Sequence, residues 1–134
     1  MEIKVKSTTN QTLNSADFAD TIIQTGVGTL QYCNNKTIIK YQVQEGNEIE
    51  NITVQIESDS VQIDRLSGNI CNTLLFTLKK FNIGEYNTSL GKLPTKIYCK
   101  EMLHQNNQLI LEYILFLAGK HNGIFQFILE YEAQ

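Results

Sequence analysis

The chain has 134 residues, of which 42% are hydrophobic and 19% are charged, and its formal net charge is −3. This length fits one domain with a single core, which we expect over residues 1–134, and the apolar content is too high for a disordered chain. The negative charge argues against nucleic acid as a partner, because phosphate binding depends on clustered Lys and Arg.

Segments typical of β-strands recur from Ile3 to Tyr131, separated by Asn, Gly, Asp or Ser. In the first segment Ile3 and Val5 share a face and alternate with charged residues. It contains no apolar stretch of the kind found in a secretory signal, so we expect a cytoplasmic protein. The next stretch, Asn14 to Asp20, favours either a helical turn or the start of the second strand.

The segment from Thr21 to Cys33 is also strand-like, but it contains Gly26 and Gly28. Glycine lets a strand bend sharply, which the closure of a barrel requires. A phosphate-binding interpretation of Gly-x-Gly needs a following helix, whereas the residues from Thr29 onward continue as a strand. We therefore predict a bent strand and no nucleotide site.

Period-two alternation continues through the middle of the chain. Ile52, Val54 and Ile56 share a face, because successive side chains of a strand point to opposite sides. The connections are too short for helical crossovers, so the strands should be antiparallel. Asn and Gly supply the positive φ that tight turns need. We expect turns at Asn34–Asn35, Gly46–Asn47, Ser58–Asp59, Gly68–Asn69, Gln105–Asn107 and Asn122–Gly123.

The segment Leu109 to Leu117 differs from the others because both of its faces are apolar. Ile110, Ile114 and Phe116 lie on the face that would otherwise meet solvent. An uncovered apolar patch usually marks an interface, so this face favours a homodimer, although an N-terminal turn or loop that packs over it would explain it equally well. Glu112 interrupts the run, which is also too short for a membrane span.

Three motifs follow one another from the middle of the chain onward: Val61-Gln-Ile-Asp-Arg-Leu-Ser-Gly, then Leu74-Leu-Phe, then Tyr86-Asn-Thr-Ser-Leu-Gly. In form and order they resemble the YwiB-like family of bacterial proteins of unassigned function, and the resemblance spans nearly the whole chain. Ser89 and Leu90 depart from the family, in which Pro often follows the Thr. The resemblance implies an all-β fold, a closed antiparallel calycin-like or lipocalin-like barrel of about eight to ten strands. It implies no activity.

Arg65, Tyr86 and Thr88 are the candidate ligand-binding residues. By alternation Arg65 shares an inward face with Val61 and Ile63, and Tyr86 shares a face with Thr88. A small barrel can hold one ligand, and an inward guanidinium together with a phenol would bind the carboxylate of an apolar or amphipathic molecule. The structural alternative is that Arg65 pairs with an internal carboxylate or a turn carbonyl. Tyr86 and Thr88 would then form hydrogen bonds at the barrel rim.

Catalytic and metal-binding patterns are absent from the sequence. Cys33, Cys71 and Cys99 have the spacing neither of a disulfide framework nor of a metal knuckle, so we expect reduced core or strand cysteines. His104 and His121 do not form a metal-ligand pair, and no nucleophile motif occurs. The acidic residues near the turns are expected in solvent, at Glu45, Glu48, Glu50, Glu57 and Asp59.

We therefore expect a barrel without enzymatic activity, metal or cofactor, which binds a small apolar or amphipathic ligand in its interior. The alternative is a protein interaction module that uses the apolar outer face or an exposed strand edge. A third hypothesis is an enzyme whose site is assembled in space from distant strands.

Overall fold

The computed structural model of the protein describes residues 1–12 and 19–134. Most of the stretch for which a helical turn or a strand start is predicted lies outside the described residues. The described chain forms ten strands and contains no helix that could cross a membrane. The strands are β1 (Glu2–Thr12), β2 (Ala19–Cys33), β3 (Lys36–Glu45), β4 (Glu48–Ile56), β5 (Ser60–Ser67), β6 (Ile70–Thr77), β7 (Phe81–Thr88), β8 (Gly91–Gln105), β9 (Gln108–Leu117) and β10 (Lys120–Ala133).

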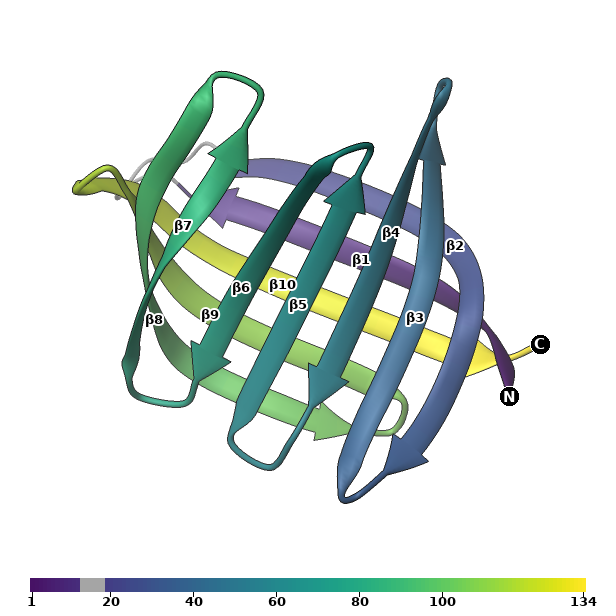
Figure 1. Ribbon diagram of the computed structural model, residues 1–134. Helices are drawn as coiled ribbons and strands as arrows, with labels where there is room; N and C mark the ends of the chain where they lie inside the picture. The colour runs from purple at the N-terminus through teal and green to yellow at the C-terminus, as the bar shows by residue number, and fades with distance from the viewer. Residues whose placement is uncertain (13–18) are drawn as a thin grey trace.

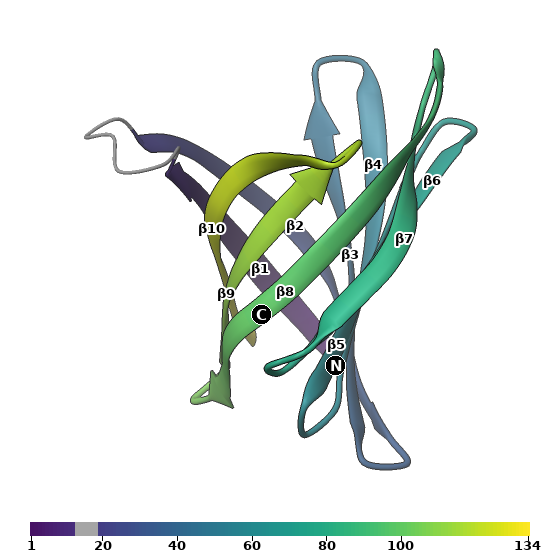
Figure 2. The same ribbon diagram turned by 90° about the vertical axis from the view of Figure 1, so that its left-hand side faces the viewer.

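All ten strands belong to one antiparallel sheet with the order β6-β5-β4-β3-β2-β1-β10-β9-β8-β7. Consecutive strands are neighbours except for β6 and β7, and β1 pairs with β10, which brings the two ends of the chain together. The sheet curls until its two edge strands, β6 and β7, lie side by side (Figures 1 and 2). The predicted all-β antiparallel barrel is therefore confirmed.

Side chains, and not a backbone ladder, join β6 to β7. The Asn87 backbone N–H donates to Asn72 Oδ1 (2.6 Å), and Asn72 Nδ2 donates to the Asn87 carbonyl (3.1 Å). Asn87 Nδ2 also donates to the carbonyl of Cys71 (2.7 Å), and Asn82 Nδ2 donates to Thr77 Oγ1 (3.0 Å). We call this junction the β6–β7 seam. It closes the barrel where the sheet has its two edges.

Alternation along the strands places one face of each strand in the core. In β1, for example, Ile3, Val5 and Ser7 are buried and alternate with residues that are exposed or partly exposed. β-Branched and aromatic side chains suit this pleated surface, and each large apolar side chain that is fully buried contributes about 1.5–3 kcal/mol. The most deeply buried side chains include Ile3, Ile39, Val54, Phe76, Leu111 and Leu129.

The interior is buried at one end of the barrel and partly exposed at the other. Along β9, Leu109, Leu111 and Tyr113 are buried, whereas Leu115 and Leu117 are partly exposed. The partly exposed end carries the hairpins β3–β4, β5–β6, β7–β8 and β9–β10 (Figure 1). We call it the open end.

Gly26 and Gly28 allow β2 to approach β3 closely. A Cβ atom at Gly26 would collide with the carbonyl of Gln42, and one at Gly28 would collide with the carbonyl of Lys40. β2 curves strongly around the barrel (Figure 1), as the glycines predict. It pairs with β3 only over Val27–Cys33, so toward the open end the two strands no longer share a ladder.

One predicted turn is wrong. Asn34 and Asn35 have the expected positive φ, 51° and 66°, in the β2–β3 hairpin. The last hairpin, however, turns at Ala118–Gly119, and Asn122–Gly123 forms a bulge inside β10. A bulge and a turn both favour Gly with positive φ, so Gly123 alone did not distinguish them. As a result β10 begins at Lys120, before the predicted turn.

Candidate functional site

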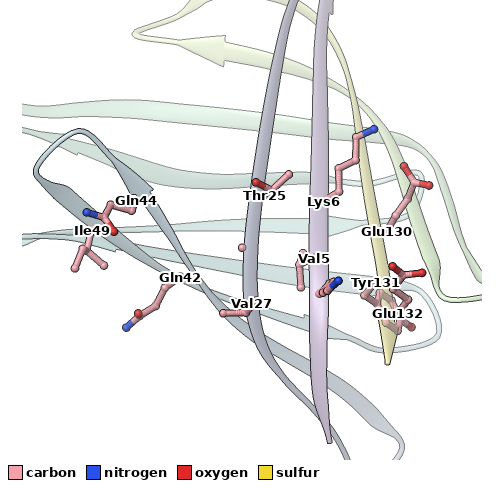
Figure 3. A pocket seen from close by; sticks show the side chains of 12 residues that line it. Val5, Lys6, Thr25, Val27, Gln42, Gln44, Ile49, Glu130, Tyr131 and Glu132 are labelled. Atoms are coloured by element: carbon pink, nitrogen blue, oxygen red, sulfur yellow. The ribbon is translucent and has the colours of Figure 1, made fainter. Parts of the chain in front are cut away.

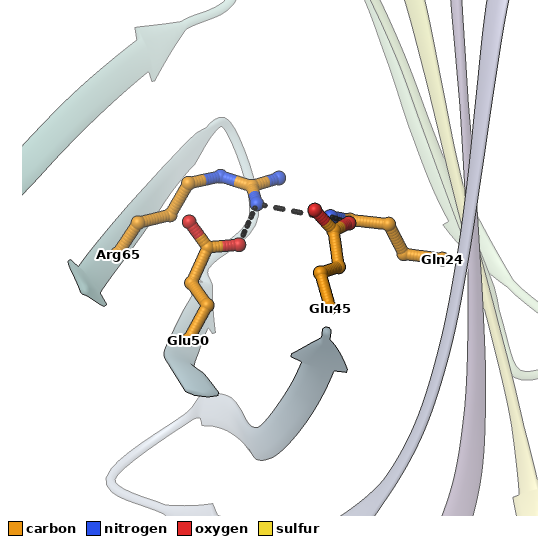
Figure 4. Close-up of polar contacts among 4 residues, drawn as sticks. All are labelled: Gln24, Glu45, Glu50 and Arg65. Carbon is orange, nitrogen blue, oxygen red and sulfur yellow. Dashed lines mark hydrogen bonds and ion pairs between the residues drawn. The ribbon is translucent and has the colours of Figure 1, made fainter. Parts of the chain in front are cut away.

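Arg65 points into the barrel at the open end. It lies on the same face of β5 as the buried Val61 and Ile63, and its Nη1 donates to Glu50 Oε1 (3.0 Å) on β4 and to Gln24 Oε1 (3.4 Å) on β2. Since β3 and β4 separate β5 from β2 in the sheet, the contact with Gln24 must cross the interior (Figure 4). The predicted inward direction of Arg65 is thus what the structure shows.

Four side chains form what we call the rim cluster: Gln24, Glu45, Glu50 and Arg65. Gln24 Nε2 donates to Glu45 Oε1 (2.7 Å), and Gln24 Oε1 accepts from Arg65 (Figure 4). The cluster spans the gap where β2 and β3 have stopped pairing. It contains one cationic and two anionic groups, so at neutral pH its formal charge is negative.

The hydroxyl of Tyr41 is buried and has no hydrogen-bond partner among the described residues. Burial raises the pKa of Tyr41, and Arg65 and the nearby Ser7 hydroxyl partly oppose the shift, although Ser7 does not reach hydrogen-bonding geometry. Burial also raises the pKa of Tyr113 to about 12, again with a small opposing effect of Arg65. Both phenols are therefore uncharged and lie within electrostatic reach of the rim cluster.

Apolar side chains line the barrel wall at the open end. Leu74, Leu115 and Phe125 are partly buried and pack against the core. The Phe125 ring stacks on Tyr113 with 5.3 Å between centroids. Ile22, which lies on the inward face of β2 by alternation, is 59% exposed. An apolar wall thus lies beside a polar cluster at the same end.

Tyr86 and Thr88 lie on the β7–β8 hairpin. Tyr86 pairs with Leu93 and is 40% exposed. Thr88 Oγ1 donates to the Gly91 carbonyl (2.8 Å) and accepts from the Leu90 N–H (3.2 Å), so its hydrogen bonds serve its own turn. Among the described residues no hydrogen bond or ion pair joins either side chain to Arg65. The structure places all three at the open end but does not bring them into contact.

The sequence interpretation missed the partners of Arg65. Glu50 is expected in solvent, yet it is only partly exposed and neutralises the guanidinium, as the structural alternative foresaw. Glu45 is exposed, as expected, and joins the rim cluster through its bond from Gln24. The signal was present, because Glu50 shares the inward face of Ile52 and Val54. Gln24 carried no such signal, since its contact with Arg65 depends on the curvature of β2.

Neither the cysteines nor the histidines form a reactive site. Cys99 is buried, which raises the pKa of its thiol, while Cys33 and Cys71 are exposed on strands. His104 Nε2 lies 2.7 Å from the Tyr131 hydroxyl, and burial lowers the pKa of His104. In the described part of the chain no three acidic, His or Cys side chains are grouped as metal ligands.

A groove of about 790 Å³ lies on the outside of the barrel, where β2 leaves β3 (Figure 3). Outward side chains of β10, β1, β2, β3 and β4 line it, with both charge signs present. They include Lys4, Lys6, Val27, Ile49, Glu130 and Glu132.

Comparisons with known proteins concern the family and the fold. Residues 3–129 match the family described as "Domain of unknown function (DUF1934)". No curated protein matches the chain. Among solved structures, the crystal structure of the ywiB protein from Bacillus subtilis matches with a TM-score of 0.75 and 16% sequence identity, covering 99% of this chain and 92% of that chain. At this identity the likeness shows the fold alone.

Proposed function

The chain belongs to the DUF1934 family, as the resemblance to YwiB-like proteins predicted, and from its barrel we propose that it binds a small amphipathic ligand at the open end of the interior. The proposed function is binding without catalysis, metal or cofactor. A cytoplasmic location is part of the same proposal.

The observation that carries the proposal is the buried hydroxyl of Tyr41, for which residues 1–12 and 19–134 supply no hydrogen-bond partner. Buried polar groups are nearly always hydrogen-bonded, and an unsatisfied one costs about 1–3 kcal/mol. Tyr41 is 3% exposed and lies close enough to Arg65 and Glu50 for both to affect its pKa. A ligand head that enters beside Arg65 and bonds to this hydroxyl would recover that energy.

The partly exposed apolar side chains suit the remainder of such a ligand. Leu74, Leu115 and Phe125 face the interior without being fully covered, and an alkyl chain laid against them would remove apolar surface from water. Tyr86, on the β7–β8 hairpin, offers a further ring at the rim. Thr88 would act indirectly by holding the turn of that hairpin.

The charge of the rim cluster favours an uncharged head over a carboxylate. Arg65 is the expected carboxylate anchor, but Glu50 already occupies it at 3.0 Å, and Glu45 adds a second negative charge nearby. A fatty acid would have to displace Glu50 and place its own charge beside Glu45. A hydroxyl or amide head can both donate and accept hydrogen bonds without that repulsion.

Calorimetric titration with a monoacylglycerol and with the fatty acid of equal chain length tests the proposal. We expect the wild type to bind the monoacylglycerol more tightly. Tyr41→Phe should weaken that binding roughly five- to tenfold without loss of stability, because it removes only the unpartnered hydroxyl. Glu50→Gln should strengthen binding of the fatty acid.

Tyr32→Phe is the matched control, because Tyr32 is 70% exposed and lies next to the β2–β3 turn at the opposite end of the barrel. Its affinity should equal that of the wild type. A wild-type protein that binds neither amphiphile, or a Tyr41→Phe variant that binds as tightly as the wild type, would refute the site.

A further inference from the structure

One side of the barrel exterior presents a row of side chains that are apolar at every position except Thr8. The backbone register aligns outward-facing residues of β8, β9, β10, β1 and β2 at the same height. Leu103 and Ile23, at the ends of the row, are 48% and 58% exposed. We call it the apolar row: Leu103, Ile110, Ile128, Thr8 and Ile23.

Toward the open end the same outer face carries a polar row and then a second apolar one. In the polar row Asn10 Nδ2 donates to Gln126 Oε1 (3.2 Å), and Lys100 pairs with Glu112 (3.2 Å). Beyond it lie Ile114 and Ile124, which are register partners, followed by Phe116. These apolar side chains are only partly buried by their own barrel.

On the other side of the apolar row, the charges are sorted by strand. β1 presents Lys4 and Lys6, and β10 presents Glu132 and Glu130 directly beside them. All four are exposed, and the external groove leaves them accessible. One strand is therefore cationic and its neighbour anionic at the same height.

We propose that this outer face binds a second copy of the chain, with a two-fold axis parallel to the strands and between β1 and β10. Such an axis places β10 of one copy over β1 of its partner. Residues at the same height along the two strands then face each other. Glu130 then faces the partner's Lys6, and Glu132 faces the partner's Lys4.

The same axis matches the other rows. Ile110 faces the partner's Ile23, and Ile128 faces the partner's Thr8, whose side chain carries a methyl group. Gln126 faces the partner's Asn10, so amides meet amides. Packed sheets keep their strands within about 30° of each other, which this arrangement allows. A two-fold axis across the strands would instead lay β1 on β1 and would never pair the lysines with the glutamates.

Sedimentation velocity at concentrations on the order of tens of micromolar tests the proposal, because dimerisation depends on concentration. The wild type should be a dimer. Two double variants, Lys4→Glu/Lys6→Glu and Glu130→Lys/Glu132→Lys, each place like charges opposite one another. Each should dimerise at least about tenfold more weakly than the wild type. An equimolar mixture of the two should restore the dimer.

Glu85→Lys, on the exposed β7, changes charge outside this face and should leave the dimer intact. Ile110→Asp should yield a monomer whose unfolding temperature stays close to that of a monomeric charge variant. A wild type that sediments as a monomer, or a mixture that fails to associate, would overturn the proposal. Neither result depends on whether the open end binds a ligand.

Discussion

In the described part of the chain the barrel has two places where adjacent strands lack a backbone ladder, and side chains bridge them in different ways. At the β6–β7 seam the bridge is neutral and reciprocal, and Asn72 is 9% exposed. At the open end the rim cluster bridges β2 to β3 and β5 with charged groups, and the side chains of Arg65 and Glu50 are 25% and 27% exposed. The first bridge is centred on a buried side chain, and the second on side chains that are partly exposed.

This difference indicates which of the two bridges stabilises the fold and which can rearrange. A buried hydrogen bond cannot be exchanged for one to water, so its loss leaves unsatisfied groups. A partly exposed ion pair contributes little, because its charges can be solvated when they separate. The β6–β7 seam should therefore be structural, whereas the rim cluster can give way to a ligand without unfolding the barrel.

Gly28→Ala should produce the largest loss of stability, because it disrupts the backbone ladder between β2 and β3. A Cβ atom at Gly28 collides with the Lys40 carbonyl and lies 2.7 Å from Tyr41 Cα, both of which belong to the backbone of β3. The strands must move apart, and we expect a loss of about 3 kcal/mol in the free energy of unfolding. Urea denaturation monitored by tyrosine fluorescence measures it.

Gly84→Ala is the matched control in a strand. Its Cβ atom would meet only Thr95 Oγ1, at 3.3 Å, which belongs to a side chain and not to the backbone. The substitution also reduces the entropy of the unfolded chain, so stability should change by less than about 1 kcal/mol. Equal losses for the two variants would show that the close approach of β2 and β3 is not what Gly28 provides.

Asn72→Ala should have the second-largest effect, and it tests whether the β6–β7 seam is structural. The change removes both bonds to Asn87 and leaves the N–H and the carbonyl of Asn87 without their partner. We expect a loss of about 2 kcal/mol and faster hydrogen exchange of amides in β6 and β7.

The control for this variant is Asn51→Ala. Asn51 is exposed and accepts one hydrogen bond from Gln42, so its loss should cost less than about 0.5 kcal/mol. A cost for Asn72→Ala that is no larger than this would remove the contrast between a buried and an exposed bridge.

Local patterns in the sequence were enough to predict the features that depend on a single strand or a single turn. Alternation identified Arg65 as inward, and Gly26 and Gly28 predicted the bend of β2, because both signals act within a single strand. The hairpin turn at Asn34–Asn35 followed from the preference of Asn for positive φ.

The two bridges themselves were beyond such patterns. Asn72 and Asn87 lie on strands that do not pair, so no register relation connects them before the sheet has curled. Gln24 and Arg65 are 41 residues apart and meet only across the interior. Side-chain contacts that depend on closure require the three-dimensional path of the sheet.

The smallest effect should come from breaking the Arg65–Glu50 pair, and it completes the comparison. In a double-mutant cycle with Arg65→Met and Glu50→Gln, the coupling energy should be below about 1 kcal/mol and should fall further as salt is added, because both side chains are partly exposed. Thermal unfolding of the four proteins at low and high salt measures it. A coupling of 2 kcal/mol or more on the scale of buried pairs would mean that the rim cluster is as structural as the β6–β7 seam. A ligand could then enter only by working against the stability of the barrel itself.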